Sequence, residues 1–333
     1  MINQWVTSIG RAAGALAAVI SLAGPLPASA QSPDAFPSRT IRLVVPQTAG
    51  TGGDMAARLM AEQFKLDLGQ SVVVDNRAGA NGMIAMAYLA KQPPDGYTLL
   101  LAGVSQMSFN AHLYKEDAFD STKDFAYVSP TVEVPFVLVA SKKSGIRTLQ
   151  DTIALSKTKP GGVFFASGGV GNSTHLAPVM LALRADMPST HVPYSGSSGA
   201  LMSVVSGETD IMVSPLPIAL PHITSGALTP VAMFSSRRAK QLPDVATLKE
   251  LGLDVPEMPG WYALIAPAGI DPKVAKVLEA SAAKMFADPH VIERLYGQGM
   301  SVVGGTAEQA RARGLNDSKT WGELIRTQNI KPD

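Results

Sequence analysis

Small polar residues follow apolar runs at two places in the chain, residues 41–58 (IRLVVPQTAGTGGDMAAR) and 163–176 (VFFASGGVGNSTHL). In both stretches the apolar run predicts a strand, and a pattern of helical period follows the small residues. Glycine lets a ligand approach the backbone, and Ser, Thr and Asn side chains add hydrogen-bond donors. The two stretches therefore predict two loops that can each hold an anion without an arginine.

The chemistry of these loops comes from the helix that each of them opens. A helix start has unpaired backbone amides and a partial positive charge of about half an elementary unit. In an open α/β sheet such starts lie at the carboxyl ends of the strands, where ligands bind. Other short polar residues follow further predicted strands at this edge. We predict as ligand-binding residues Thr48, Ala49, Thr51, Gly52, Ser105, Asn110, Ser167, Gly171, Asn172, Ser173, Thr174, Tyr194, Ser195, Ser214 and Pro215.

The residues of the two loops match the motifs of enzyme sites poorly. The second loop contains GxGxxT instead of the GxGxxG of dinucleotide sites, and the sequence has no P-loop GK[ST]. Ser173 and Ser105 are candidate nucleophiles for a rival interpretation, a secreted α/β serine hydrolase, but neither completes GxSxG. The five histidines lack HxxxH and HExxH spacing, so we expect no metal, no cofactor and no catalysis. Two ordinary βα turns with capped helices are the plainest alternative.

Asp54 and Arg58 lie just past the first loop. A carboxylate directed into an anion site would repel its ligand, so we expect Asp54 to stabilise the first helical turn. Arg58 is one turn further and is placed to pair with Asp54. Whether either residue touches the ligand is left open by the sequence.

The bulk composition narrows the class of partner. The 333 residues are 46% hydrophobic and 17% charged, which suits a globular chain with proper cores. With 28 Lys plus Arg against 27 Asp plus Glu, a basic groove for nucleic acid is not expected. The absence of cysteine excludes disulfides and thiol chemistry. We expect a small-molecule ligand and a monomeric protein.

The first 30 residues resemble a secretory signal peptide. A weakly basic start precedes an apolar run at residues 12–22, and Pro25 and Pro27 come before an Ala-Ser-Ala cleavage motif. No later segment of the sequence approaches 18 uninterrupted apolar residues. An exported chain of this size without disulfides predicts a periplasmic location.

Strand-like and helix-like runs alternate along the remaining chain, which is typical of βαβ units. Expected strands are 41–45, 71–75, 97–102, 136–140, 163–166, 191–193, 210–213, 230–234 and 261–266. Expected helices are 55–68, 81–91, 149–157, 174–185, 199–206 and 217–225, with a terminal helix that Asp271 caps and Pro272 begins.

These elements divide into two α/β halves. The first half ends near Ala140, and the second closes in the breaker-rich residues 257–260. The terminal helices have no sheet of their own, so we expect them to return to the first half. The predicted domains are 36–140 plus 262–333 (discontinuous) and 141–261, with two chain crossings, as in a hinged clamp.

An ordered set of motifs resembles the Bug family of periplasmic solute-binding receptors, also called the TctC-like receptors of tripartite tricarboxylate transporters. The resemblance covers the chain from Phe36 to about Thr306 and is specific as a set. The motifs are residues 46–58, 76–82 (NRAGANG), 94–99 (PDGYTL), 110–114 (NAHLY), 165–176, 191–194 (HVPY), 207–210 (GETD) and 242–245 (LPDV).

The resemblance implies a two-domain α/β periplasmic binding protein, a type II Venus flytrap in which each lobe is a mixed or parallel sheet flanked by helices. It implies that the ligand carboxylate is held between residues 47–53 and 167–174 by backbone amides, hydroxyls and ordered waters. It also implies delivery to the membrane permease subunits (TctA- and TctB-like) of such a transporter, or a role as the ligand-binding partner of a sensor.

Three segments depart from the usual family pattern: 47–49 (QTA), 195–198 (SGSS) and 214–217 (SPLP). We expect these positions to face the far end of the ligand, so the solutes of relatives do not transfer directly. The absence of Arg and Lys inside the loops favours a dicarboxylate held by neutral donors. Candidate apolar walls make an aromatic dicarboxylate such as terephthalate an alternative: Met107, Phe109, Phe136, Pro215 and Leu216.

Overall fold

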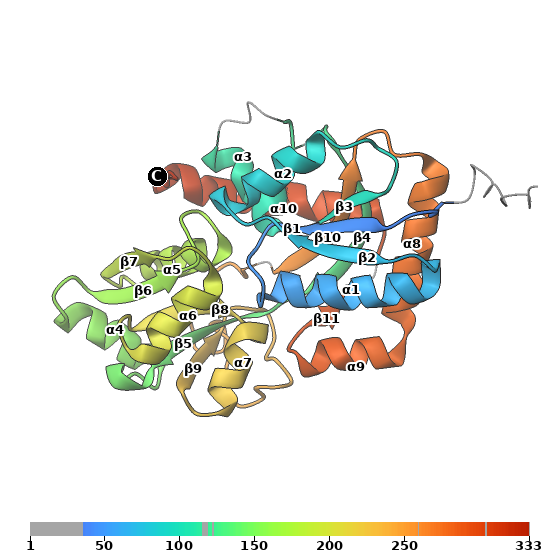
Figure 1. Ribbon diagram of the computed structural model, residues 1–333. Helices are drawn as coiled ribbons and strands as arrows, with labels where there is room; N and C mark the ends of the chain where they lie inside the picture. The colour runs from blue at the N-terminus through green and yellow to red at the C-terminus, as the bar shows by residue number, and fades with distance from the viewer. Residues whose placement is uncertain (1–35, 115–118, 122, 259, 304, 333) are drawn as a thin grey trace, which may run out of the picture.

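The computed structural model describes residues 36–114, 119–121, 123–258, 260–303 and 305–332. The signal peptide expected at residues 1–30 lies outside this described part. Two lobes are visible in Figure 1, one built mainly from the blue, cyan and orange parts of the chain and the other from the green and yellow parts. Within the described residues, no helix has the length and apolar content needed to cross a membrane.

The first lobe contains a six-stranded mixed sheet of order β11-β4-β10-β3-β1-β2. The strand bounds are β1 Ile41–Val45, β2 Val72–Asn76, β3 Thr98–Gly103, β4 Phe125–Glu133, β10 Trp261–Pro267 and β11 Ser301–Val302. β1 pairs in parallel with β2 and β3, whereas β10 is antiparallel to β3 and β4. The helices of this lobe are α1 Gly52–Leu68, α2 Met83–Ala90, α3 Asn110–Leu113, α8 Pro272–Ala287, α9 Pro289–Gly297 and α10 Ala307–Thr327.

The second lobe contains a five-stranded mixed sheet of order β7-β6-β8-β5-β9. Its strands are β5 Phe136–Ser141, β6 Val163–Ser167, β7 Ser189–Pro193, β8 Ile211–Pro215 and β9 Leu228–Met233. Its helices are α4 Leu149–Thr158, α5 Ser173–Arg184, α6 Ser197–Ser206 and α7 Leu216–Thr224. Three short helical segments complete the part of the chain that the structure describes: η1 Ala80–Gly82, η2 Ser105–Phe109 and η3 Lys142–Ser144.

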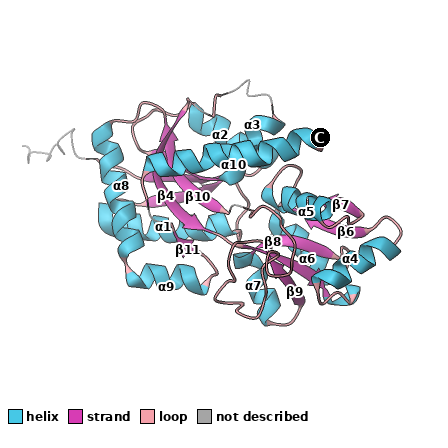
Figure 2. Cartoon of the chain, turned by 180° about the vertical axis from the view of Figure 1, so that it is seen from behind, coloured by secondary structure: helices cyan, strands magenta, loops and turns pink. Residues whose placement is uncertain are grey.

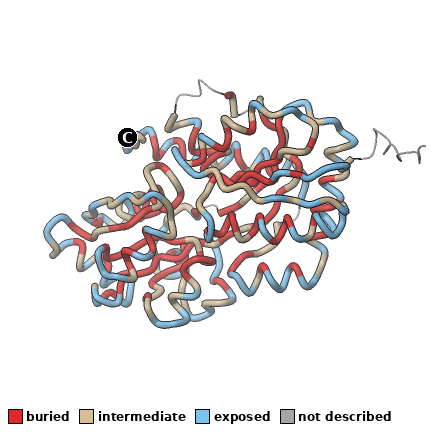
Figure 3. Tube along the Cα trace, in the orientation of Figure 1, coloured by how far each residue is buried: buried red, intermediate tan, exposed pale blue. Residues whose placement is uncertain are grey.

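The helix ends have local causes in the sequence. Thr51 caps α1 and Gly69 ends it in the left-handed conformation, which glycine adopts without a Cβ clash. Asp271 caps α8 through the Lys273 amide, and Pro272 is its first residue, as predicted. The central strands β1, β3 and β10 of the first sheet and β5, β6 and β8 of the second are buried along most of their length, and Figure 3 shows buried chain through the middle of both lobes. Their apolar side chains therefore form the cores that fix the loops at the strand ends.

The chain crosses between the lobes earlier than the sequence suggested. The strand expected to close the first half, now β5, pairs with β8 and β9 and belongs to the second sheet. The first crossing therefore lies at Val134 and Pro135, before Phe136 instead of at Ala140. The return crossing ends at Gly260, since Trp261 is already in β10 of the first sheet. The two crossings are joined by a hydrogen bond from the Val134 amide to the Gly260 carbonyl, 2.6 Å long.

The C-terminal helices cover the first lobe. α8 packs against α1 and β4, and α10 packs against β4 and η2. Figure 2 shows α10 running lengthwise over the first sheet towards α5, which it also contacts. The loops at the strand ends that face the other lobe are therefore supported by a packed core in each lobe.

Candidate functional site

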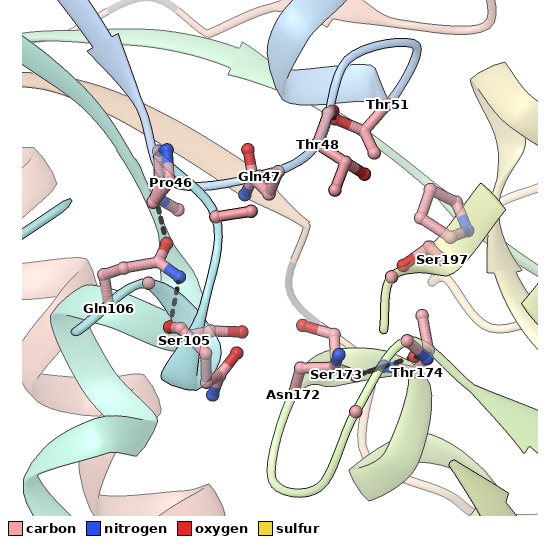
Figure 4. Close-up of a pocket in the computed structure, with 18 of the residues that line it drawn as sticks. Pro46, Gln47, Thr48, Thr51, Ser105, Gln106, Asn172, Ser173, Thr174 and Ser197 are labelled. Atoms are coloured by element: carbon pink, nitrogen blue, oxygen red, sulfur yellow. Dashed lines mark hydrogen bonds between the residues drawn. The ribbon is translucent and has the colours of Figure 1, made fainter. Parts of the chain in front are cut away.

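A cavity of about 680 Å³ lies between the two lobes, at the carboxyl ends of strands from both sheets. Its walls come from the loops after β1, β2, β3, β6, β7 and β8, as the close-up in Figure 4 shows for part of them. Among the described residues that line it, no side chain is charged. An anion bound here would meet hydroxyls, amides and aromatic edges.

The loop after β1 leads directly into α1. Thr48 and Thr51 both line the cavity, and Thr51 donates its hydroxyl to the Thr48 carbonyl at 2.9 Å. The same Thr51 oxygen accepts from the Asp54 amide at 3.5 Å, so this hydroxyl serves the loop itself. Within the described residues, the amide of Gly52, the first residue of α1, donates to no backbone group outside the helix. The first loop therefore presents the Thr48 hydroxyl and a free amide at the helix start.

Asp54 holds this loop in place from behind. It is buried and accepts from the Gly50 amide at 2.9 Å, Arg58 Nε at 3.0 Å and Asn76 Nδ2 at 3.0 Å. Burial alone would raise the pKa of Asp54, but the bonds from Arg58, Gly50 and Asn76 outweigh it and hold the pKa below its usual range. Neither Asp54 nor Arg58 lines the cavity, which agrees with the structural role expected for Asp54.

The loop after β6 uses most of its own donors. Asn172 caps α5, and its Oδ1 accepts from the Thr174 amide at 2.9 Å, the His175 amide at 3.2 Å and Thr174 Oγ1 at 2.6 Å. Thr174 Oγ1 in turn accepts from the Gly168 amide at 2.8 Å. We expected free amides at the start of this helix, and that expectation is wrong for the amides of Thr174 and His175. Asn and Thr side chains bond to nearby backbone amides more readily than they leave them free.

Two stacked histidines support the second loop from outside the cavity. His175 Nδ1 accepts from the Gly171 amide at 3.0 Å, and the rings of His175 and His191 are 3.9 Å apart between centroids. Burial, with a smaller contribution from His191, lowers the pKa of His175 to about 3. His175 is therefore neutral at ordinary pH. His175 Nδ1 is therefore taken by a backbone amide and is not the base for Ser173, the nucleophile of the hydrolase interpretation.

Five predicted ligand residues do not line the cavity. Ser167 is fully buried beneath the loop and lies 2.6 Å from His191 Nε2. Asn110 is buried beside Asn81, Ser214 is buried and donates to the Pro215 carbonyl, Ala49 is exposed, and Gly171 donates to His175. The side chains of Ser167, Asn110 and Ser214 hold loops instead, a role that these residue types can fill as well as ligand contact.

The remaining predicted residues do lie together at the cavity wall. They are Thr48, Thr51, Gly52, Ser105, Asn172, Ser173, Thr174, Tyr194, Ser195 and Pro215. Tyr194 contributes its ring or backbone only, because its buried hydroxyl lies beside Ser203 and Glu208. Of the suggested apolar walls, Phe136 and Pro215 line the cavity, whereas Met107, Phe109 and Leu216 do not.

Residues 78–82 form a third wall that sequence analysis missed. Four consecutive residues, Gly79 to Gly82, have positive φ angles, including φ 44° at Ala80 and φ 50° at Asn81. Gln106 fixes the segment, since its Nε2 donates to the Asn81 carbonyl at 2.8 Å and its Oε1 accepts from the Gly103 amide at 2.9 Å. A Cβ at Gly82 would collide with Gln106 and Pro46. The sequence Gly-Ala-Asn-Gly at residues 79–82 indicates such a left-handed turn, because Gly and Asn adopt positive φ angles most readily.

Aromatic side chains form the wall nearest the crossings. Phe136, Trp261 and Tyr262 line the cavity, together with Tyr114. Trp261 Nε1 donates to Asp317 Oδ2 at 2.7 Å, and burial raises the pKa of Tyr262 to about 12. The Trp261 ring is fixed by Asp317, and the four rings offer flat apolar surface to a ligand.

The lobes touch at the rim of the cavity. A Cβ at Gly196 would lie 3.2 Å from Thr48 Oγ1, and one at Gly52 would lie 3.6 Å from Pro217 Cγ. A Cβ at Gly171 would collide with Leu113. All three glycines therefore lie against residues of the other lobe, so the two lobes are close together at the rim.

Comparison with known proteins agrees with this architecture. The family model described as "Tripartite tricarboxylate transporter family receptor" matches residues 56–330. Protein BugT of Bordetella pertussis is 33% identical over 319 residues, which are 96% of this chain and 96% of BugT. The structure of R. palustris Rpa4515 with adipate has a TM-score of 0.86 at 28% identity and covers 90% of this chain and all of that chain. MatC from Rhodopseudomonas palustris with bound malate has a TM-score of 0.81 at 27% identity and covers 87% of this chain and all of MatC.

Proposed function

Because the chain belongs to the family of tripartite tricarboxylate transporter receptors, which are periplasmic solute-binding proteins and not enzymes, we propose that it captures a dicarboxylate in the cavity between its lobes. We propose further that it works in the periplasm as a monomer and passes its ligand to membrane permease subunits of such a transporter. Small carboxylates are the ligands of the family, so the proposal concerns the number of carboxylates and their spacing.

The observation that carries the proposal is the pair of hydroxyl-bearing helix starts on opposite walls of an uncharged cavity. Thr48 and the Gly52 amide belong to the first lobe, and Ser173 belongs to the second. Each hydrogen bond to a carboxylate contributes roughly 1.5–3 kcal/mol, and a helix start adds about 1 kcal/mol. Two carboxylates held in this way reach the approximately −8 kcal/mol of micromolar binding after ordering costs.

The spacer between the two carboxylates is the finer part of the proposal. Two relatives were solved with the aliphatic dicarboxylates adipate and malate, which favours an aliphatic ligand. The rings of Phe136, Trp261 and Tyr262 favour a flat aromatic spacer such as that of terephthalate. Both spacers belong in the same test.

A thermal-shift screen of the purified mature protein tests the ligand class, because a ligand that binds only the folded state raises the melting temperature. The panel contains mono-, di- and tricarboxylates with aliphatic and aromatic spacers, and amino acids and sugars as controls. We expect dicarboxylates to give the largest shift and calorimetry to give micromolar affinity. A panel in which sugars or amino acids give the largest shift would overturn the proposal.

Uptake and location have their own tests. Deleting the gene should abolish accumulation of the labelled ligand in cells, whereas a sensor partner would leave accumulation intact. The mass of the protein from the periplasmic fraction should correspond to a chain that starts at Gln31. Full-length protein retained in the membrane fraction would contradict export by a cleaved signal peptide.

A further inference from the structure

Three uncharged polar side chains lie on the first-lobe side of the ligand cavity. Gln47, Ser105 and Tyr262 all line it, and they come from the loop after β1, the start of η2 and strand β10. Figure 4 shows Gln47 and Ser105 on one side of the cavity, across from Ser173 of the second lobe. We call Gln47, Ser105 and Tyr262 the cavity floor.

Ser105 places an unpaired hydroxyl in a closed part of the wall. It is only 9% exposed, and its Oγ makes no hydrogen bond to any residue that the structure describes. Its polar neighbours differ, since Gln106 bonds to Asn81 and Gly103, and Ser108 donates to the Gly314 carbonyl at 2.9 Å. Ser105 is therefore placed to bond to a ligand.

Gln47 adds an unpaired amide. Its Oε1 is buried, and none of the described residues donates to it. A buried acceptor without a donor costs free energy, so in a cavity wall it indicates a contact that the ligand completes. The oxygen and nitrogen of this amide have similar sizes, and a half-turn of the amide lets either one face the cavity. Gln47 can therefore accept a hydrogen bond from a ligand or donate one to it.

The Tyr262 ring lies between these two groups. A Cβ at Gly53 would lie 3.0 Å from Tyr262 Cε1 and would collide with Gln47 Oε1. A Cβ at Gly103, two residues before Ser105, would lie 3.1 Å from the same ring atom. The ring therefore packs against the loop of Gln47 on one side and the loop of Ser105 on the other. Glycine at both positions leaves the space that it needs.

The floor is suited to a neutral polar group. Burial raises the pKa of Tyr262 to about 12, and the Gly53 amide opposes this shift only in part. An environment that disfavours a phenolate also disfavours an additional carboxylate. A hydroxyl group both donates and accepts hydrogen bonds, so it matches the Ser105 and Tyr262 hydroxyls and the Gln47 amide.

The floor adjoins the anchor proposed for one carboxylate. Gln47 directly precedes Thr48, and Gly53, which lies against Gln47 and Tyr262, directly follows Gly52. A substituent that reaches the floor is therefore attached close to the carboxylate that Thr48 and the Gly52 amide hold.

We propose that the floor recognises a hydroxyl group on the carbon next to this first carboxylate, so that the preferred ligand is a 2-hydroxydicarboxylate. The inference rests on the proposed function, because it places the hydroxyl relative to a carboxylate held by the first lobe. A ligand without the hydroxyl leaves buried polar groups unpaired, and a site of this kind rejects the analogue that lacks the group. Gln47, Ser105 and Tyr262 are then specificity-determining residues.

Calorimetry with matched ligands on the purified mature protein tests the floor. The pairs are succinate with 2-hydroxysuccinate and adipate with 2-hydroxyadipate. In the pair that binds better, we expect the hydroxylated member to bind at least about tenfold tighter, because its absence leaves buried groups unpaired. The readout for each variant is this ratio of affinities, which a general loss of stability or of carboxylate binding does not change.

Ser105→Ala and Gln47→Leu should each lower the ratio to about threefold or less. Tyr262→Phe keeps the ring that packs against the two glycines and should also lower the ratio. The matched control is Ser108→Ala, which removes a hydroxyl of the same segment that bonds inside the protein, and it should leave the ratio unchanged.

The outcomes separate this inference from the proposed function. Dicarboxylates that bind without preference for the hydroxylated member, or a ratio that all three floor variants leave unchanged, would refute the hydroxyl subsite and leave dicarboxylate binding standing. An equal fall of the ratio in Ser108→Ala would likewise overturn the assignment to the floor. Failure of every dicarboxylate to bind would refute the proposed function, and the subsite with it.

Discussion

The loops after β1 and β6 have similar sequences but use their polar groups differently. The first loop is fixed from behind by Asp54, and it leaves the Gly52 amide and the Thr48 hydroxyl at the cavity. The second loop is fixed from within by Asn172, whose side chain takes up two amides and one hydroxyl. The difference teaches that a Gly-, Ser- and Thr-rich loop can be an open donor surface or a self-bonded one.

Removing the self-bonding side chain should have the largest effect. Asn172→Ala leaves the Thr174 and His175 amides without their acceptor, so the second loop loses its shape. We expect dicarboxylate affinity, measured by calorimetry, to fall about 30-fold and stability to fall by about 1–2 kcal/mol. Thr51→Ala removes the matching cap of α1 and should cost similar stability but less than threefold in affinity. Equal losses of affinity would erase the distinction between the loops.

Asp54→Asn should separate stability from binding in the first loop. The substitution weakens a buried set of bonds to Gly50, Arg58 and Asn76, and we expect a loss of about 2 kcal/mol by denaturant unfolding. Affinity should stay within threefold because Asp54 does not line the cavity.

The pH dependence of the free energy of unfolding gives an independent check on the structural role of Asp54. The pKa of Asp54 is lowered in the fold, so its contribution is complete above about pH 4 and is lost as the pH falls through the lowered value. Arg58→Met removes only one of the three hydrogen-bond partners of Asp54, so it should lower the stability less than Asp54→Asn. A large loss of affinity in Asp54→Asn would place its carboxylate in the ligand site after all.

His175 should make the second loop sensitive to acid. Its pKa of about 3 in the fold lies below the ordinary histidine value, so between these values the unfolded chain binds more protons than the fold. Stability should therefore fall as pH falls, by about 1 kcal/mol between pH 6.5 and 5.5. His175→Gln should flatten this part of the profile in denaturant titrations. An unchanged slope would mean that His175 titrates normally in the fold.

Thr48→Val should have the smallest effect on stability. It removes one hydroxyl from the first loop while keeping the shape that meets Gly196, so we expect affinity to fall about tenfold, the lower end of what a hydrogen bond to a carboxylate contributes, and stability to stay unchanged. Ser173→Ala is the matching change in the second loop. Affinity that is insensitive to both changes would show that hydroxyls on the two lobes do not hold the ligand.

Much of the fold followed from local sequence patterns. The expected strands and helices match most observed elements within a few residues, because apolar period and capping residues act locally. β4 was missed because it contains Pro130, which ordinarily argues against a strand interior. The first crossing was misplaced because sheet membership of β5 depends on pairing with β8 and β9, which lie about 70 residues or more further along the chain.

The cavity wall was predictable in outline and less so residue by residue. The position after parallel strands brought Thr48, Ser105 and Ser173 to the wall as expected. Ser167 and Asn110 turned inward because His191 and Asn81 were available as partners, and such pairings are set by the tertiary structure. The wall at residues 78–82 was missed because its shape depends on positive φ angles. The segment is held by a hydrogen bond from Gln106, about 25 residues further along the chain, and such a contact is set by the tertiary structure.

A crystal structure with the dicarboxylate that gives the largest thermal shift tests the central claim most directly. The account predicts one carboxylate within hydrogen-bonding distance of Thr48 or the Gly52 amide and the other bonded to Ser173, with no charged side chain in contact. A ligand held by one lobe alone, or paired with a charged side chain, would contradict it.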